Sequence, residues 1–213
     1  MAVTVYYMSG SPYPWRVRLA LEHKGIPYDL KTVSYDAGDL NTPEYAKLNP
    51  RRRVPVIVDD GFVLYESAAI VEYIADKWHG EPLLFSSDLR QRGVQWRMVR
   101  EVDQYFGAGL EGLVEAILFT PQERWSYEKI FGARDTMKKE LAILETGIAG
   151  EYLAGALSAV DFTLYPFVAL VQRMGKRKSG LVPPDFMGPK IGAWVRRMET
   201  LPITQKTWPP HWK

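Results

Sequence analysis

The chain has 213 residues, of which 46% are hydrophobic and 24% are charged, and its formal net charge at pH 7 is +2. These values are ordinary for a globular protein, and the length suffices for a sizeable core in one domain or two small ones. A net charge so near zero argues against a dedicated nucleic-acid surface. The sequence contains no cysteine, which excludes disulfides, thiolate metal sites and a cysteine nucleophile. Any thiol chemistry would therefore use the sulfur of a substrate.

The sequence has neither the pattern of a signal peptide nor an apolar run long enough to cross a membrane, and we therefore predict a cytoplasmic protein. Residues 1–7 lack the basic region and long apolar stretch of a signal peptide. The longest apolar run, 162–171, is too short to span a bilayer. The histidines at positions 23, 79 and 211 are scattered, without the spacing of metal ligands. We therefore expect neither a membrane segment nor a metal.

The first 77 residues predict the order strand, helix, strand, followed by strand, strand, helix. The expected elements are strand 3–7, helix 15–24, strand 28–33, helix 43–48, strands 56–58 and 62–64, and helix 66–77. The first three form a βαβ unit, whose strands should be parallel. Asp60-Gly61 between the later two strands is a hairpin signal. This order matches a thioredoxin-like domain.

From residue 88 onward the sequence predicts helices only. One helical stretch is expected over 89–119, bent near Gly107 and Gly109, and a second over 121–148. Ser158 to Asp161 has the pattern of a capping box, which would open a buried helix over 164–174. The predicted fold is thus an α/β domain, residues 1–79, followed by an all-α domain, residues 88–213.

A proline and a helix start, close in sequence, carry the most information about function. Pro55 opens an apolar run, where a strand tolerates proline at its first position. The backbone of Val54 is then free to pair with an extended, peptide-like ligand. Glu66 and Ser67 stand at the start of a helix, which offers unpaired N–H groups and the positive end of a dipole. A small peptide with an amino-acid head would satisfy both halves.

This arrangement resembles the glutathione site of the cytosolic glutathione transferases, and the resemblance covers nearly the whole chain. It implies glutathione as the co-substrate, with its cysteinyl backbone on Val54 and a cis bond before Pro55. It assigns the γ-glutamyl end to Glu66 and Ser67. On the residues alone, Glu66 and Ser67 could equally serve as helix caps.

Conjugation of glutathione needs a thiolate, and a hydroxyl that donates to the sulfur lowers the pKa of the thiol. Ser11, between the first strand and the first helix, matches the catalytic serine of the serine-type transferases, of which the zeta class is most similar. Alternatively, Ser11 caps the helix or forms a turn. Tyr6 and Tyr7 are rivals because other classes use a tyrosine there, whereas Ser9 lies too near the strand.

Three positions depart from the family pattern. Pro12 and Tyr13 stand where the zeta class usually has a serine and a cysteine, which counts against zeta-type isomerase chemistry. Tyr13 would line the site or pack near its mouth. Arg53 takes the place of a lysine or glutamine, and its guanidinium is suited to the glycyl carboxylate of glutathione. A solvated loop arginine is the alternative for Arg53.

The second substrate is expected against the long helix, where Tyr105 is a candidate contact and Phe106 and Trp96 are more typical of the core. Trp208 or Trp212 is expected to fold over the substrate cleft. We predict a homodimeric glutathione transferase that acts on a small hydrophobic electrophile. Glutathione-dependent isomerisation or dehalogenation, and a non-catalytic ligand-binding or interaction protein, are the alternatives. The chain has Ser11, Pro55, Glu66 and Ser67 together, and a non-catalytic protein need not retain all four, which favours the enzyme.

Overall fold

The computed structural model describes residues 2–178 and 180–212. The chain divides into two compact units, one formed by Met1–Phe85 with Leu201–Lys213 and the other by Ser86–Thr200. This division differs from the expected domains at the C-terminus, because the sequence assigned 201–213 to the helical part. The two units are described separately below.

The first unit is built on a four-stranded mixed sheet. Its strands are β1 (Val3–Tyr7), β2 (Tyr28–Thr32), β3 (Val56–Asp59) and β4 (Phe62–Tyr65), in the order β2-β1-β3-β4. β1 pairs with β2 in parallel, and the other two pairings are antiparallel. The predicted βαβ-ββα order of a thioredoxin-like domain is therefore confirmed.

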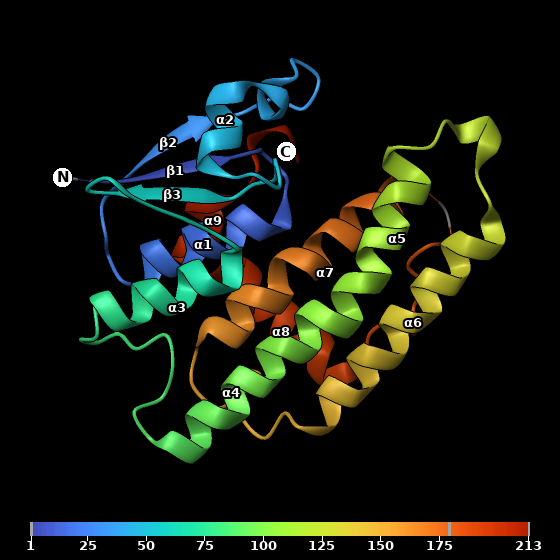
Figure 1. The fold of residues 1–213 in the computed structure, drawn as a ribbon. Coiled ribbons are helices and arrows are strands. Elements are labelled where there is room, and N and C mark those ends of the chain that lie inside the picture. The colour runs from blue at the N-terminus through green and yellow to red at the C-terminus, as the bar shows by residue number, and fades with distance from the viewer. Residues whose placement is uncertain (1, 179, 213) are drawn as a thin grey trace. The chain divides into compact units, whose positions relative to one another are not determined.

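Helices cover both faces of this sheet. They are α1 (Pro12–His23), α2 (Pro43–Leu48), α3 (Ser67–Lys77) and α9 (Pro202–Thr207). α1 and α3 lie side by side on one face and α2 lies on the other (Figure 1). Short 3₁₀ turns occur at Asp39–Asn41 and Pro210–Trp212. α1 begins before the predicted residue 15 because Pro12 occupies its first position, where proline lacks only a donor that has no helical partner.

The second unit is helical in all of its described residues except for turns and an isolated bridge between Tyr152 and Gly155. Its elements are α4 (Leu89–Glu101), the π-helical turn η2 (Val102–Phe106), α5 (Gly107–Leu118), the 3₁₀ turn η3 (Gln122–Arg124), α6 (Tyr127–Thr146), α7 (Ala159–Arg177) and α8 (Pro189–Thr200). α7 lies in the middle of this unit (Figure 1) and supplies many of its buried side chains. The π-helical turn ends at Phe106, directly before Gly107, where the sequence predicted a bend.

The predicted capping box opens α7. The carboxylate of Asp161, which is fully buried, accepts hydrogen bonds from the backbone N–H of Ser158 at 2.9 Å and of Leu153 at 3.0 Å. The indole N–H of Trp194 on α8 donates to the same carboxylate at 2.8 Å. One side chain thus joins the segment before α7, the start of α7 and α8.

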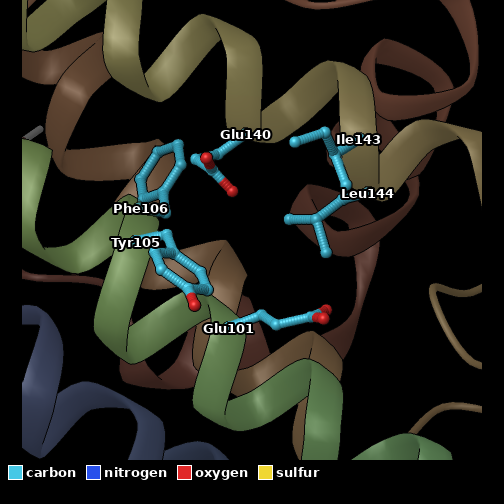
Figure 2. A pocket seen from close by; sticks show the side chains of 6 residues that line it. All are labelled: Glu101, Tyr105, Phe106, Glu140, Ile143 and Leu144. Atoms are coloured by element: carbon cyan, nitrogen blue, oxygen red, sulfur yellow. The ribbon is translucent and has the colours of Figure 1, made fainter.

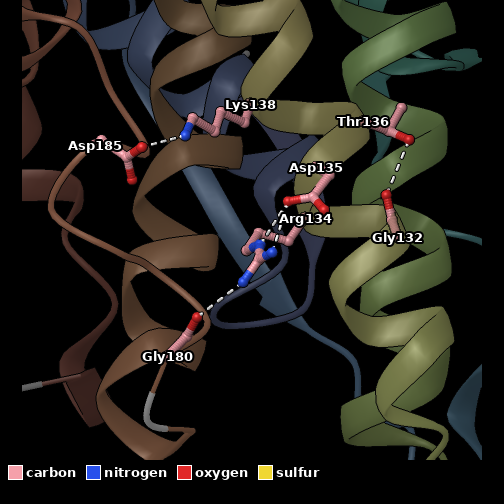
Figure 3. Close-up of polar contacts among 7 residues, drawn as sticks. All are labelled: Gly132, Arg134, Asp135, Thr136, Lys138, Gly180 and Asp185. Atoms are coloured by element: carbon pink, nitrogen blue, oxygen red, sulfur yellow. Dashed lines mark hydrogen bonds and ion pairs between the residues drawn. The ribbon is translucent and has the colours of Figure 1, made fainter.

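Polar contacts of α6 fix the segment that follows α7. Arg134 donates to the carbonyl oxygen of Gly180 at 3.2 Å, and Lys138 forms an ion pair with Asp185 (Figure 3). Glu145, near the end of α6, accepts from the backbone N–H of Ile191 in the first turn of α8 at 3.2 Å. Exposed ion pairs contribute little free energy, so these contacts mainly determine the path of the chain between α7 and α8.

Candidate active site

The register of the sheet brings three segments to one of its ends. Tyr6 on β1 lies opposite Val56 at the start of β3, and Val56 lies opposite Tyr65 at the end of β4. The chain leaving β1, the chain entering β3 and the chain leaving β4 therefore meet at the same end. These are the segments that carry Ser11, Val54 with Pro55, and Glu66 with Ser67. Sequence spacing alone did not give this convergence.

Ser11 stands at the junction between the turn after β1 and α1. It occupies the N-cap position in an extended conformation, and its side chain makes no capping hydrogen bond. Its backbone N–H donates to the carbonyl oxygen of Met8 at 3.2 Å, and Gly10 has a φ of +85°. The alternative in which the Ser11 hydroxyl caps the helix is therefore not what the structure contains. The hydroxyl of this half-buried residue is available to a ligand.

The two tyrosines of β1 occupy different environments. Tyr6 packs on a cluster of Val33, Leu40, Tyr45 and Val56, as expected for one residue of an alternating pair. The guanidinium of Arg18 lies over the ring of Tyr7, 5.3 Å from its centroid.

The loop before β3 presents the backbone of Val54. The Val54–Pro55 peptide bond is cis, as the resemblance implied. The carbonyl oxygen of Arg53 accepts from the hydroxyl of Tyr45 at 2.9 Å and from the side-chain amide of Asn49 at 2.8 Å. Burial raises the pKa of Tyr45 to about 12, so its hydroxyl remains a donor. Within the described residues, the backbone of Val54 forms no hydrogen bond to another backbone group.

Glu66 and Ser67 form the start of α3. Glu66 is exposed and has a φ of +69°, a conformation that costs on the order of 1–3 kcal/mol for a residue with a Cβ atom. Ser67 is buried, and its Oγ accepts a hydrogen bond from Nε of Arg16 at 3.0 Å. Because Oγ accepts from the guanidinium, its own proton remains available to a ligand carboxylate.

Arg16 was not singled out as a site residue from the sequence. It is only 2% exposed, and its guanidinium carbon lies 5.6 Å from the ring centroid of Tyr13. A buried arginine needs a partner, and its neighbours Trp15 and Val17 are also buried. The available signal was an arginine between Trp15 and Val17, two apolar residues of the helix. Arg53, by contrast, is exposed.

Tyr105 belongs to the second unit and lines a cavity of about 250 Å³. The cavity is lined by Glu101, Tyr105, Phe106, Glu140, Ile143 and Leu144, which come from α4, η2 and α6 (Figure 2). Phe106 is fully buried and stacks on Phe167, which confirms its place in the core.

The core prediction for Trp96 is wrong, because this residue is 45% exposed. The buried face of α4 carries Gln95, Met98 and Val99, and Trp96 is rotated from that face by the helical repeat. Trp208 and Trp212 pack against Trp15 in the first unit, with ring centroids 5.5 and 5.6 Å away.

The described residues contain neither a cluster of metal ligands nor a membrane-spanning helix. No group of three or more histidine, aspartate and glutamate side chains in residues 2–178 and 180–212 could hold a metal ion. In the same part of the chain, no helix is long and apolar enough to cross a membrane.

Comparisons with known proteins agree with this geometry. Residues 10–77 match the family described as the glutathione S-transferase N-terminal domain. Glutathione S-transferase 1 of Dianthus caryophyllus is 34% identical over 166 residues, which cover 76% of this chain and 74% of the relative. Maleylacetoacetate isomerase of Mus musculus is 30% identical over 177 residues, which cover 79% and 78%.

A solved structure extends the similarity to nearly the whole chain. The theta class glutathione S-transferase of Xanthomonas axonopodis pv. citri, with glutathione bound, has a TM-score of 0.83 and 25% sequence identity. The match covers 97% of this chain and 96% of that protein. With the thioredoxin-like sheet, the helical second unit and these matches, the chain belongs to the glutathione S-transferase family and is a glutathione S-transferase.

Proposed function

We propose that the hydroxyl of Ser11 donates a hydrogen bond to the thiolate of bound glutathione and thereby activates it. The observation that carries this proposal is the convergence of Ser11, Val54 and Ser67 at one end of the sheet, set by the Tyr6–Val56–Tyr65 register. A hydrogen bond to the anion lowers the pKa of the thiol. The thiolate then attacks an electrophilic carbon, the carbon–sulfur bond forms, and the leaving group departs with its electron pair.

The rest of glutathione is held by the segments beside Ser11. The backbone of Val54 pairs with the cysteinyl residue as an added strand would, and Pro55 shapes that loop. Glu66 binds the amino group of the γ-glutamyl end. Ser67 and the N–H groups of α3 bind its carboxylate. Arg53 meets the glycyl carboxylate from the solvent side.

Tyr105, in the second unit, is proposed as a contact of the second substrate. Tyr13, in the first unit, stays a separate candidate contact. The cavity beside Tyr105 is more apolar than polar, with Ile143 and Leu144 in its lining together with the carboxyl side chains of Glu101 and Glu140. Such a lining suits a small hydrophobic electrophile.

The test is a titration of the purified protein with reduced glutathione, followed by the ultraviolet absorbance of the thiolate. The parent should hold bound glutathione as thiolate at neutral pH. In Ser11→Ala the lost bond to an anion contributes about 1.5–3 kcal/mol, so the thiol pKa should rise by about 1–2 units. The kcat/KM for conjugation should fall roughly ten- to hundredfold.

Ser87→Ala is the matched control, because Ser87 is exposed and lies outside the site. Equal thiolate in the parent and in Ser11→Ala would transfer the role to Tyr6, Tyr7 or Tyr13. Absence of glutathione binding by the parent would contradict the proposed site as a whole.

Glutathione-dependent isomerisation is the second candidate, because a maleylacetoacetate isomerase is among the similar proteins. The same thiolate would add to an unsaturated acid, and its later elimination would regenerate glutathione. Pro12 and Tyr13 count against this activity, because the zeta class usually has a serine and a cysteine at these positions. Assay of both reaction types with the same preparation separates the two.

The cellular setting is proposed from the family. We propose a serine-type enzyme related to the zeta and theta classes, homodimeric and cytoplasmic, that detoxifies small electrophiles. Neither a nucleic acid nor a membrane is a proposed partner. The two proposed functional parts are residues 1–79, which bind glutathione, and 88–213, which contribute to the second-substrate site.

A further inference from the structure

The C-terminal segment, residues 207–212, is anchored on α1 a short distance from Ser11. The indole N–H of Trp15 donates to Oγ1 of Thr207 at 2.8 Å, and Arg18 donates to the carbonyl oxygen of Thr207 at 3.1 Å. Trp212 is 8% exposed and packs edge-on against Trp15. Trp15 follows Ser11 within the first turn of α1. The segment is therefore held beside the residue that starts the helix.

From this anchor, the segment reaches the turn that carries Ser11. Oγ of Ser9 and Nδ1 of His211 share a hydrogen bond of 3.1 Å. A Cβ atom added to Gly10 would lie 3.0 Å from Cε1 and Nε2 of His211 and 3.1 Å from Nε1 of Trp212. The C-terminal segment thus lies directly against the backbone of Gly10, whose positive φ already favours glycine.

We infer that His211 is a positioning residue for the active site. It binds Ser9, packs on Gly10 and so holds the turn that directs the hydroxyl of Ser11 toward the thiol. A hydrogen bond to the thiolate weakens steeply when its angle departs from linear. A looser turn would therefore raise the pKa of the glutathione thiol while the contacts at Val54 and Ser67 persist. This inference rests on the proposed function of Ser11.

The experiment compares the full-length parent with His211→Ala, Ser9→Ala, the double variant and His211→Asn. Asparagine attaches a polar atom to Cγ, where histidine has Nδ1, and can retain the bond to Ser9. One hydrogen bond at a half-exposed site contributes modestly, so the alanine variants should lower the thiolate fraction of bound glutathione about two- to fivefold at neutral pH. The dissociation constant of glutathione should change less than twofold.

Two patterns among the variants identify the hydrogen bond itself. The double variant should be no worse than the poorer single variant, because each change removes the same bond. His211→Asn should recover most of the thiolate fraction. His79→Asn, a change at an exposed histidine that follows the end of α3 opposite to Ser67, is the control and should match the parent.

A second readout does not depend on glutathione. Amide hydrogen exchange in residues 8–11 of the ligand-free protein should be faster in His211→Ala and near the parental rate in His211→Asn. Unchanged exchange and unchanged thiolate in His211→Ala would overturn the inference, as would equal loss in the alanine and asparagine variants. Absence of thiolate in the parent would contradict the role of Ser11, and the exchange rates would then decide the role of His211 by themselves.

Discussion

Arg16 connects the two helices that begin at the proposed active site. It lies on α1, is buried, and donates to the hydroxyl of Ser67 at the start of α3. A buried guanidinium places positive charge where the γ-glutamyl carboxylate is proposed to bind, and it orients the Ser67 hydroxyl toward that carboxylate. The residue therefore acts through Ser67 as well as through its charge.

Arg16→Lys should weaken glutathione binding about tenfold, because a lysine keeps the charge but loses the donor geometry of the guanidinium. Isothermal titration calorimetry measures the dissociation constant. Arg90→Lys, at an exposed position, should leave it unchanged. Unaltered binding in Arg16→Lys would show that charge alone suffices, and unaltered binding in Arg16→Met would remove Arg16 from the site.

The sequence identified single residues wherever the signal is local. Ser11 before Pro12 and the Val54-Pro55 pair stand out within a few neighbouring positions. Arg16 and Ser67 are 51 residues apart in the sequence, so their bond depends on the packing of α1 against α3. Ser9 was set aside as the catalytic serine because it lies near the strand. Its hydrogen bond to His211, 202 positions away, left no signal in the local sequence.

Gly109 allows α5 to approach α6 closely. A Cβ atom added there would lie 2.8 Å from Cγ of Met137 and 3.3 Å from the carbonyl oxygen of Ala133. Alanine favours a helix over glycine by about 1 kcal/mol, but crowding of this kind costs about 1–3 kcal/mol. Gly109→Ala should therefore lower the free energy of unfolding by about 1 kcal/mol.

Gly112 on the same helix provides the matched control, because nothing lies within 4 Å of a Cβ atom added there. Gly112→Ala should raise the free energy of unfolding by about 0.5–1 kcal/mol. Urea unfolding measures both variants. If Gly109→Ala raised the free energy of unfolding, α5 and α6 would be able to move apart without loss of stability.

The elements were predictable to different degrees. The short strands and the helix over Ser67–Lys77 follow from alternation and from one apolar helical face. The Val56–Tyr65 pairing follows from the two-residue Asp60-Gly61 hairpin. The Tyr6–Val56 pairing was not predictable, because both strands are short and the neighbours of β1 are chosen by the packing of the whole sheet. Trp96 was assigned to the core because its side chain is aromatic, although its position on the helix lies away from the buried face.

The stability of the second unit as a whole should depend on pH through Asp161. Burial raises the pKa of its carboxyl to about 6, against the hydrogen bonds from Leu153, Trp194 and Ser158, which act in the opposite direction. The folded protein then binds this proton more tightly than the unfolded chain does. The contribution of this proton to the free energy of unfolding is fully present below about pH 4, and it is lost as the pH rises to about 6.

Asp161→Asn removes this titration. The side-chain amide of the asparagine would turn its own N–H group toward a hydrogen-bond donor such as the backbone N–H of Ser158. The free energy of unfolding of the variant should therefore be about 3 kcal/mol lower than that of the parent near pH 4. The difference in the free energy of unfolding between the parent and Asp161→Asn should shrink by about 3 kcal/mol between pH 4 and pH 7. Urea unfolding at several pH values measures this difference. If this difference grew with pH instead, the hydrogen bonds to Asp161 would outweigh its burial and keep the pKa of its carboxyl low.

The return of residues 201–213 to the first unit has a consequence for synthesis on the ribosome. Trp15 is 2% exposed in the folded protein, yet Trp208, Trp212 and Thr207, which cover it, are made only after the second unit. Domains generally fold as units during synthesis, N-terminal first. The first unit therefore keeps an uncovered indole until the whole second unit has been made, and the turn that carries Ser11 acquires the support of His211 only after that.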